Sequence, residues 1–371
     1  MKKVFKLIDY SLVVSLIITV VFGILMMYSA SSIVAVRNYG YSNDFFFRSQ
    51  LNTLFLGVFG LIICIGIPFH LWRKRMFSVC IIIGSIVLLL LVLWKGKVVN
   101  NAQSWIFGIQ PAEFIKLGVI IVLAGFFSRR QEQKKSYLQG SGKVILFLMI
   151  TFFLIYKQPN LGSALLIVGI GTCMFICSGV NITILMKWIT VTSIVWVPTL
   201  YFFVKYGLSD VQMARITTVF NPFLDPQGDG YQLINSFIAI GSGGVSGRGF
   251  GNSIQKEGFL PEPHTDFIIA IISEELGIIG VLIILTGILT IVLRSFKISQ
   301  ECKSQFGSLI AIGIGSMIGL QSIVNLGGAT GVLPLTGTPL PFVSFGGSSL
   351  MANLMSVGIL INISIFNKIN N

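Results

Sequence analysis

Long apolar stretches, separated by short charged segments, occupy most of the chain. A membrane-spanning helix needs about 20 apolar residues, and the lengths of these stretches predict ten such helices. The expected spans are residues 10–30, 50–70, 76–94, 112–128, 143–157, 161–178, 188–206, 266–293, 307–326 and 343–366. We therefore expect an all-α, polytopic integral membrane protein in which residues 1–371 form a single membrane-embedded domain.

One segment, residues 207–265, interrupts this pattern. It is polar, rich in glycine and proline, and holds no apolar run long enough to cross a membrane. Connections of this length inside a compact domain are usually functional. We expect it to form one long loop between the seventh and eighth helices.

Composition narrows the class of protein. The chain is 54% hydrophobic and 11% charged, with a mean hydropathy of +0.87, whereas soluble domains carry about 25% charged residues. A soluble enzyme, a nucleic-acid-binding domain and a disordered protein are therefore excluded. The net charge of +13 then indicates membrane orientation rather than nucleic acid as a partner.

The basic residues predict which side of the membrane each segment occupies. With the N-terminus in the cytoplasm, most of the 26 Lys and Arg residues fall in inner segments, around Lys2, Arg73, Arg129 and Arg294. Lys and Arg asymmetry sets topology. We therefore expect a plasma-membrane protein with both termini cytoplasmic and residues 207–265 extracytoplasmic.

Ionisable residues at the ends of membrane helices are candidates for function because they are costly to bury. A first cluster holds Trp105, Pro111, Glu113 and Lys116. Glu113 and Lys116 are three residues apart and can pair on one helical face. An interfacial tryptophan with a structural ion pair is the alternative interpretation.

A second cluster lies in the long segment. Arg215 precedes a glycine-rich stretch, residues 241–253, that contains Arg248. Exposed backbone N–H groups can bind anions, and arginine favours phosphate or carboxylate ligands. The stretch therefore predicts an anionic ligand, with a flexible loop as the alternative.

Asp266 stands where this segment enters the eighth helix, close to Glu262 and His264. Partial desolvation there would raise the pKa of the Asp266 carboxyl group and make it a better general base. A helix-capping role is the alternative. Glu274 lies about 12 Å further along the helix, too far to act on the same bond. Metal binding through Asp266, Glu262 or His264 is possible, but no residue spacing here is specific for a metal, so we assign no metal ligands.

A third cluster consists of Gln321, Asn325 and Ser348, with three prolines between residues 334 and 341. Prolines at membrane depth imply non-helical backbone, which is tolerated only inside protein or along a wet cavity. Packing between helix ends is the alternative.

Several ordered motifs together resemble the SEDS family of bacterial membrane proteins, the FtsW, RodA and SpoVE group. The most specific is Leu-Pro-Glu-Pro-His-Thr-Asp-Phe-Ile at residues 260–268, followed by Glu-Glu-Leu-Gly at 274–277. Matches also occur at residues 28–32, 105–106, 110–116, 158–159, 225–232 and 339–349. Two positions depart from the family pattern, since Ser104 replaces an arginine and Asn160 an aspartate. A lost ion pair and a divergent activity are both open interpretations.

The resemblance implies a ten-helix glycosyltransferase that polymerises lipid II, the undecaprenyl-pyrophosphate-linked disaccharide-pentapeptide, into peptidoglycan strands. It implies a class B penicillin-binding protein as a partner, among divisome or elongasome membrane proteins, and it identifies Asp266 as the essential carboxylate. We expect an inverting reaction in which Asp266 is the base and Lys116, Arg215 and Arg248 hold the pyrophosphate. A divalent cation, Mg²⁺ or Mn²⁺, is compatible with that role. The other substrate-binding candidates are Trp105, Glu113, Glu262, His264, Gln321, Asn325 and Ser348.

Two other functions fit the same sequence. A flippase for the lipid-linked precursor would also need many spans and a wet cavity, and a non-catalytic scaffold could recruit the penicillin-binding protein. The ionisable residues gather at the expected outer helix ends rather than through the membrane interior. That distribution favours chemistry on an already translocated substrate.

Overall fold

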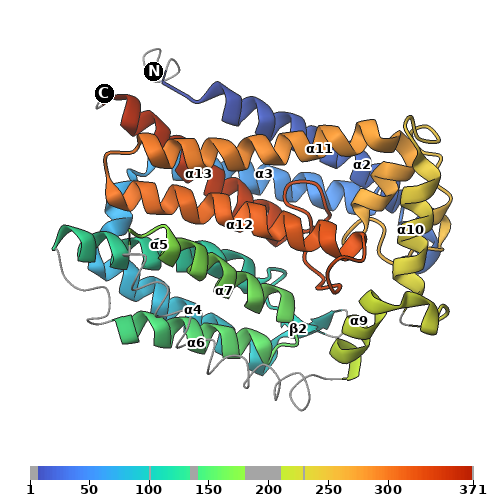
Figure 1. Ribbon diagram of the computed structural model, residues 1–371, viewed down its shortest axis with the longest axis horizontal. Coiled ribbons are helices and arrows are strands. Elements are labelled where there is room, and N and C mark those ends of the chain that lie inside the picture. Colours follow the sequence, from blue (N-terminus) through green and yellow to red (C-terminus); the bar gives the residue numbers. More distant parts are fainter. Residues whose placement is uncertain (1–6, 100–101, 134–140, 180–209, 229, 370–371) are drawn as a thin grey trace.

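The structure, a computed structural model, describes residues 7–99, 102–133, 141–179, 210–228 and 230–369. Its long helices lie side by side as a bundle (Figure 1). They are α2 (Tyr10–Tyr39), α3 (Phe45–Gly66), α4 (Arg75–Lys95), α5 (Pro111–Glu132), α6 (Ser141–Tyr156), α7 (Leu161–Ile176), α11 (Ile268–Glu301), α12 (Gln305–Ala329) and α13 (Gly347–Ile369). Each expected span coincides with one of these helices except 188–206, which lies outside the described residues.

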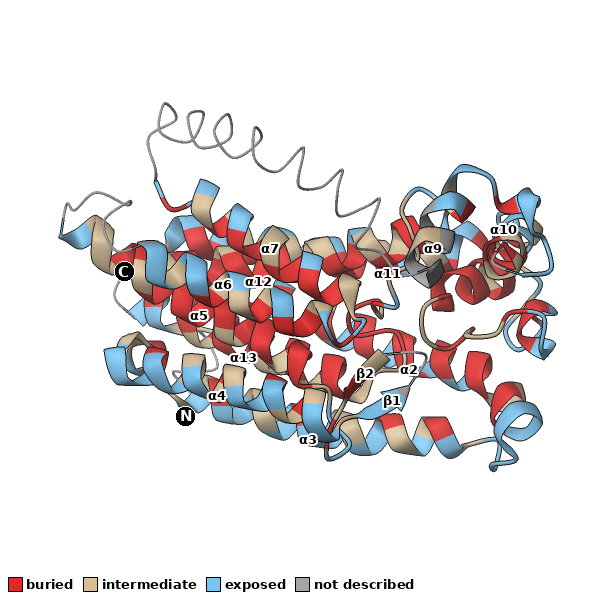
Figure 2. Ribbon diagram, turned by 90° about the horizontal axis from the view of Figure 1, so that it is seen from below, coloured by how far each residue is buried: buried red, intermediate tan, exposed pale blue. Residues whose placement is uncertain are grey.

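Seven of the described helices are long and apolar enough to cross a membrane, and α6 and α7 are shorter apolar helices. The helices α5, α12 and α13 are mostly buried, whereas α3 and α4 expose much of their surface (Figure 2). Lys368 of α13 donates to the Ile8 carbonyl, 3.2 Å away, so the start of α2 and the end of α13 are adjacent. Helices α9 (Asp210–Phe220) and α10 (Tyr231–Gly243) lie at the opposite end of the bundle (Figure 1).

Helix α2 extends well beyond the expected end at residue 30. Asp9 caps its first turn by accepting from the Leu12 N–H group, and Gly40, with φ 64°, ends it in the left-handed conformation. Arg37 lies in this extension and donates to the Glu257 carbonyl oxygen, and Ser29, just before the extension, accepts from Lys256. Hydropathy missed this part because its polar residues contact protein rather than lipid.

The 207–265 segment is more regular than a loop. Besides α9 and α10 it holds two short 3₁₀ helices, η2 (Pro222–Leu224) and η3 (Gln255–Glu257). Helix α10 packs closely on α11, which has non-helical geometry at Gly277 (φ 62°, ψ −159°). A Cβ atom on Gly277 would come within 2.3 Å of the Val245 carbonyl oxygen. The sharp bend therefore lets the segment approach α11 directly.

A small antiparallel hairpin, β1 (Lys97–Val99) with β2 (Ala102–Trp105), is the one sheet in the described part of the chain. The Gln103 side chain fastens it to α4 by donating to the Leu93 and Gly96 carbonyls at 3.3 and 3.1 Å. The hairpin leads into α5, whose first residue is Pro111. The all-α expectation holds apart from this connection. A further short 3₁₀ helix, η1 (Phe69–Arg73), joins α3 to α4.

The contact between α10 and α11 provides a test of this packing. A Cβ atom on Gly243 would lie 1.8 Å from the Ser273 carbonyl oxygen, whereas one on Gly241, in the same helix, meets nothing within 4 Å. Gly243→Ala should therefore lower the melting temperature by several degrees. Gly241→Ala should be neutral or slightly stabilising, because alanine is the better helix former by about 1 kcal/mol. Equal melting temperatures for the two purified variants would contradict the close approach.

Candidate active site

The backbone around Asp266 is fixed by residues distant in the sequence. From α12, the Asn325 side-chain amide donates to the Asp266 carbonyl at 3.1 Å and to the Thr338 carbonyl at 2.9 Å. The Ser344 hydroxyl donates to the Thr265 carbonyl at 2.6 Å. The third sequence cluster therefore holds the peptide that carries Asp266, ahead of the first turn of α11.

The Asp266 carboxyl group has the electrostatic surroundings of a base. Burial, and to a smaller extent the Glu262 carboxylate, raise its pKa to about 6, against the opposing effect of the Arg215 guanidinium. The Glu262 carboxylate itself accepts from the Thr265 hydroxyl at 2.8 Å. Gly337 faces the site, since a Cβ atom there would lie 3.8 Å from Asp266 Oδ2. Asp266 is thus ionised at neutral pH yet basic enough to accept a proton.

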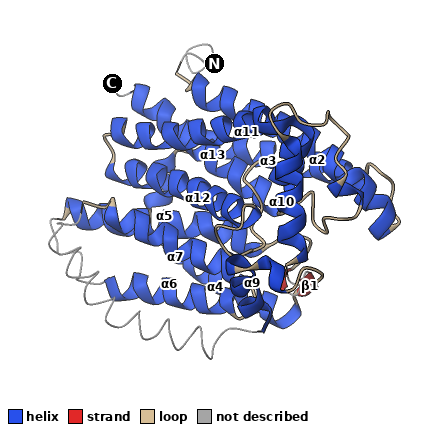
Figure 3. Ribbon diagram, turned by 45° about the vertical axis from the view of Figure 1, so that its right-hand side comes forward, coloured by secondary structure: helices blue, strands red, loops and turns tan. Residues whose placement is uncertain are grey.

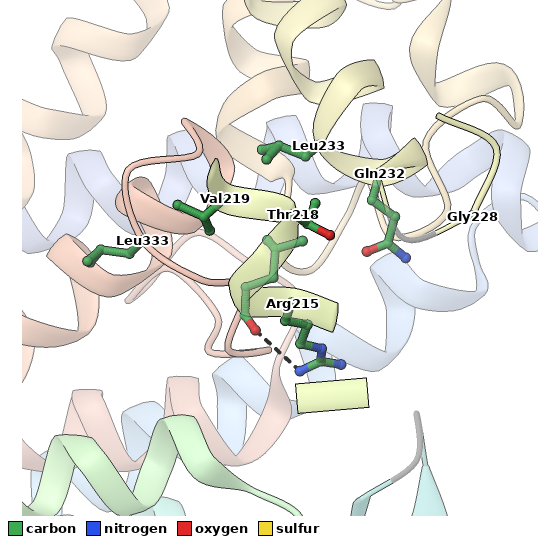
Figure 4. A pocket seen from close by; sticks show the side chains of 8 residues that line it. Arg215, Thr218, Val219, Gly228, Gln232, Leu233 and Leu333 are labelled. Carbon is green, nitrogen blue, oxygen red and sulfur yellow. Dashed lines mark hydrogen bonds between the residues drawn. The ribbon is translucent and has the colours of Figure 1, made fainter. Parts of the chain in front are cut away.

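A cavity of about 170 Å³ adjoins Arg215 between α9, α10 and the segment after α12. Its polar side chains are Arg215, Thr218 and Gln232, and its apolar ones are Val219, Leu233, Leu333 and Leu335 (Figure 4). Arg215 Nη1 donates to the Leu335 carbonyl at 3.3 Å, which holds the guanidinium at the cavity (Figure 4). The cavity suits a ligand with a polar or anionic part and an apolar part.

His264 is buried rather than open to a ligand. Its ring centroid is 4.6 Å from that of Phe46 and 5.6 Å from that of Phe345. Burial lowers the pKa of His264 to about 4, so the imidazole is neutral. Its role in substrate binding stays a prediction, and the described contacts are aromatic.

Lys116 and Glu113 form the predicted ion pair, but inside the bundle. Lys116 Nζ lies 2.9 Å from Glu113 Oε2 and donates to Gln321 Oε1 at 3.0 Å, with all three side chains buried. Gln321 in turn donates to the Pro339 carbonyl at 2.9 Å and the Ser349 hydroxyl at 3.1 Å. The role of Lys116 in holding pyrophosphate stays a prediction, and its charge has an internal carboxylate partner in Glu113.

Backbone N–H groups of the glycine-rich region bind two carboxylate side chains of the protein itself, Glu274 and Glu275. The N–H groups of Ile254 and Gln255 donate to the Glu274 carboxylate at 3.0 and 3.3 Å, and that of Gly251 donates to Glu275 at 3.0 Å. Arg248 Nη1 lies 3.7 Å from Glu274. These three N–H groups are therefore occupied and Arg248 lies beside Glu274, so its role in holding pyrophosphate stays a prediction. The sequence shows the donors but not which carboxylate they contact.

Buried polar contacts complete the second cluster. Lys256 Nζ lies 2.7 Å from Glu275 and donates to the Ser29 hydroxyl at 2.9 Å. The Ser253 hydroxyl donates to Glu274 at 2.5 Å. Sequence reasoning missed Lys256 and Ser29 as partners, although the motif match at residues 28–32 had included Ser29.

The remaining candidates have structural contacts. The Ser348 hydroxyl accepts from the Gln110 N–H group at 2.8 Å and so joins the starts of α13 and α5. Trp105 ends β2, next to the buried Ser104. Asn160 caps α7 by accepting from the Ser163 N–H group at 3.2 Å. An aspartate could cap in the same way, so Asn160 keeps this role.

Comparison with known proteins shows which family the chain belongs to. Residues 9–369 match the model of a family described as cell cycle protein, FtsW/RodA/SpoVE. The chain belongs to this family. It is 42% identical to the probable peptidoglycan glycosyltransferase FtsW of Bacillus subtilis, over 99% of this chain and 93% of that protein. It is 37% identical to stage V sporulation protein E of the same organism, over 97% and 98%.

Solved structures of the FtsW/RodA/SpoVE family share the fold. A chain from "Structural coordination of polymerization and crosslinking by a peptidoglycan synthase complex" has a TM-score of 0.77 at 25% identity, covering 97% of this chain and 98% of that one. The rod shape determining protein RodA of Thermus thermophilus has a TM-score of 0.68 at 24% identity, covering 96% of each chain. Family membership and the apolar helices together make this chain a multi-pass membrane protein.

The raised pKa of Asp266 predicts a pH-dependent effect on stability. A carboxyl group whose pKa rises from 3.8 to about 6 on folding stabilises the fold below its unfolded pKa and loses that contribution as the pH rises through about 6. Asp266→Asn should therefore raise the melting temperature by a few degrees at about pH 8. The difference in melting temperature between Asp266→Asn and the parent protein should shrink towards zero at about pH 4.5. A variant that is less stable than the parent at both pH values would contradict the raised pKa.

The buried Lys256–Glu275 pair predicts unequal effects of single and double changes. Lys256→Met leaves a buried carboxylate without its counter-charge and should cost about 3–5 kcal/mol. Adding Glu275→Gln should recover part of that loss. The matched control is Lys297→Met, which breaks the exposed pair with Glu301 and should cost no more than about 1 kcal/mol. Thermal unfolding in detergent would measure all three, and similar losses for Lys256→Met and Lys297→Met would count against the buried pair.

Proposed function

We propose that this protein is a peptidoglycan glycosyltransferase that polymerises lipid II into β-1,4-linked glycan strands, with Asp266 as the catalytic base. The observation that carries the proposal is a carboxyl group of pKa about 6 under the influence of Arg215, whose side chain lines a cavity with polar and apolar walls. Its relative in Bacillus subtilis carries the name of a probable peptidoglycan glycosyltransferase.

The proposed reaction is an inverting glycosyl transfer. The Asp266 carboxylate accepts the proton of the acceptor sugar's 4-hydroxyl group while that oxygen bonds to the donor's anomeric carbon. The bond from that carbon to the pyrophosphate oxygen breaks, so an α-linked donor gives a β-linked product. One carboxylate suffices, because undecaprenyl pyrophosphate is a good leaving group once its charge is neutralised.

Arg215 is the described cation best placed to hold the leaving pyrophosphate. It acts electrostatically on Asp266 and lines the cavity, whereas Lys116 and Arg248 are paired with internal carboxylates. The apolar wall made by Leu333 and Leu335 would accommodate the first part of the lipid. Glu262 keeps the pKa of Asp266 raised, so it favours proton acceptance from the sugar.

A divalent cation, Mg²⁺ or Mn²⁺, fits this site as a companion of the substrate. No group of three metal-ligating side chains occurs among the described residues, but Glu262 supplies a carboxylate near Asp266. Mg²⁺ is commonly bound by one or two carboxylates together with substrate phosphates. When bound, the ion would neutralise charge on the pyrophosphate.

The proposed function also implies an orientation of the protein in the membrane and a partner protein. The start of α2 and the end of α13 are adjacent, which supports placing both termini on one side, the cytoplasmic side by the distribution of basic residues. The sites at the opposite end would then be extracytoplasmic. A class B penicillin-binding protein, with other divisome or elongasome membrane proteins, is the expected partner, since one structural relative comes from a peptidoglycan synthase complex.

The decisive experiment is polymerisation of lipid II by the purified protein. Asp266→Asn should reduce strand synthesis at least about 100-fold, within the range that general base catalysis contributes, while the protein stays folded. The matched control Glu301→Gln removes an exposed carboxylate at the far end of α11 and should retain activity. In the parent protein, kcat/KM should rise through about pH 6 and then level, as Asp266 loses its proton.

This assay also separates the rival functions. A scaffold or flippase would leave lipid II unpolymerised in the parent protein and in both variants. Near-normal strand synthesis by Asp266→Asn would contradict the role of Asp266. Loss of activity on removal of divalent ions, restored by Mg²⁺ or Mn²⁺, would support the cation.

A further inference from the structure

Three aromatic side chains with large uncovered surfaces lie at the turn between α2 and α3. Tyr39, Tyr41 and Phe45 are 49%, 48% and 42% exposed. The Tyr41 ring stacks on Phe45 with centroids 4.2 Å apart, and it lies nearly parallel to Tyr39 at 6.0 Å. We call these three residues the aromatic platform.

The aromatic platform is continuous with the Asp266 site. Phe46, which is buried, contacts Tyr39 and Phe45 with ring centroids 5.6 and 5.4 Å away, and on its other side contacts His264 at 4.6 Å. The Tyr39 phenol is also close enough to the Glu262 carboxylate to interact with it electrostatically. Glu262 acts in the same way on Asp266. The aromatic platform is therefore linked, through Phe46 and Glu262, to the residues around Asp266.

The platform has a fixed position relative to the site. The Arg37 guanidinium donates to the Glu257 carbonyl oxygen, which fastens the end of α2 to the segment that carries the motif. Beyond the turn, Arg48 pairs with Asp44 at 2.5 Å. A ligand on the platform would thus not have to order a loose loop, which lowers the cost of binding.

The platform also extends out of the membrane-embedded part of the bundle. The 30 residues of α2 span about 45 Å, whereas the hydrocarbon core of a bilayer is about 30 Å thick. The C-terminal end of α2 projects at the same end of the molecule as α9 and α10 (Figure 3). Because Phe45 is also the first residue of the candidate span α3, the platform lies at the end of the spanning helices, where a polar ligand can approach it.

We propose that the aromatic platform is a saccharide subsite, which holds sugar rings of the glycan strand beyond the ring that reacts at Asp266. The C–H faces of pyranose rings carry slight positive charge and stack on the negative faces of aromatic rings. The hydroxyl groups of Tyr39 and Tyr41 can in addition bond to sugar hydroxyl or acetamido groups. The identity of the strand as peptidoglycan rests on the proposed function, but binding of sugar rings does not.

The competing explanation is an interfacial anchor, because tyrosine is common at membrane–water boundaries. An anchor requires exposed rings at the right depth and no relation to a catalytic group. The continuous contacts from Tyr41 through Phe46 to His264, and the coupling of Tyr39 to Glu262, favour a ligand subsite. The two explanations also predict different effects of removing the rings.

The test is binding of a β-1,4-linked N-acetylglucosamine tetrasaccharide to the full-length protein in detergent, measured by saturation-transfer NMR. The protein carries Asp266→Asn so that binding is observed without turnover. Tyr41→Leu and Phe45→Leu, which keep apolar area but remove the ring, should each weaken the Kd at least about fivefold. Phe45→Trp should retain binding.

The matched control is Phe55→Leu, also on α3 and 75% exposed but away from the turn; it should leave the Kd unchanged. Unchanged binding in Tyr41→Leu and Phe45→Leu overturns the subsite, as does an equal loss in Phe55→Leu. A lower melting temperature with unchanged binding also overturns it and identifies an anchor.

A second measurement distinguishes failure of the subsite from failure of the proposed function. With Asp266 intact and lipid II supplied, Tyr41→Leu and Phe45→Leu should give shorter strands than the parent and Phe55→Leu. Tetrasaccharide binding that depends on the platform, without any strand synthesis by the parent, supports the subsite and rejects the proposed function. Strands of unchanged length with unchanged tetrasaccharide binding reject the subsite and leave the function standing.

Discussion

Two adjacent buried carboxylates, Glu274 and Glu275, hold together the end of the molecule that lies opposite the chain termini. Each would be costly to bury alone, and each is therefore surrounded by donors. Backbone N–H groups of residues 251–255, the Ser253 hydroxyl and Lys256 all converge on them. The segment between the expected membrane spans folds as it does because these charges must be satisfied.

This constraint also places the candidate catalytic group. With residues 244–260 fixed against α11, the following residues reach the start of α11 along a defined path, and Asn325 and Ser344 hold their backbone from the other side. Asp266 is left partly buried, between the influence of Glu262 and that of Arg215. Such preorganised surroundings cost nothing at the moment of reaction.

The basic residues considered for the site differ in what they contact. Lys116, Lys256 and Arg248 pair with internal carboxylates, whereas Arg215 is bonded to a carbonyl oxygen and lines a cavity. Of these four, Arg215 is the one that acts electrostatically on Asp266. A buried ion pair contributes little to binding a ligand but keeps a helix contact specific.

The sequence by itself determined the helical membrane fold, the positions of its described spans and the position of Asp266 at the start of a helix, because apolar length and local motif are properties of neighbouring residues. It also determined the Glu113–Lys116 pair, which depends only on helical spacing. Only the tertiary structure decided that Lys116 is buried against Gln321, that the glycine-rich stretch surrounds Glu274 and Glu275, and that Phe46 of α3 contacts His264. Lys116 and Gln321 are 205 positions apart, and the free energy of burying a charge depends on which distant partner reaches it.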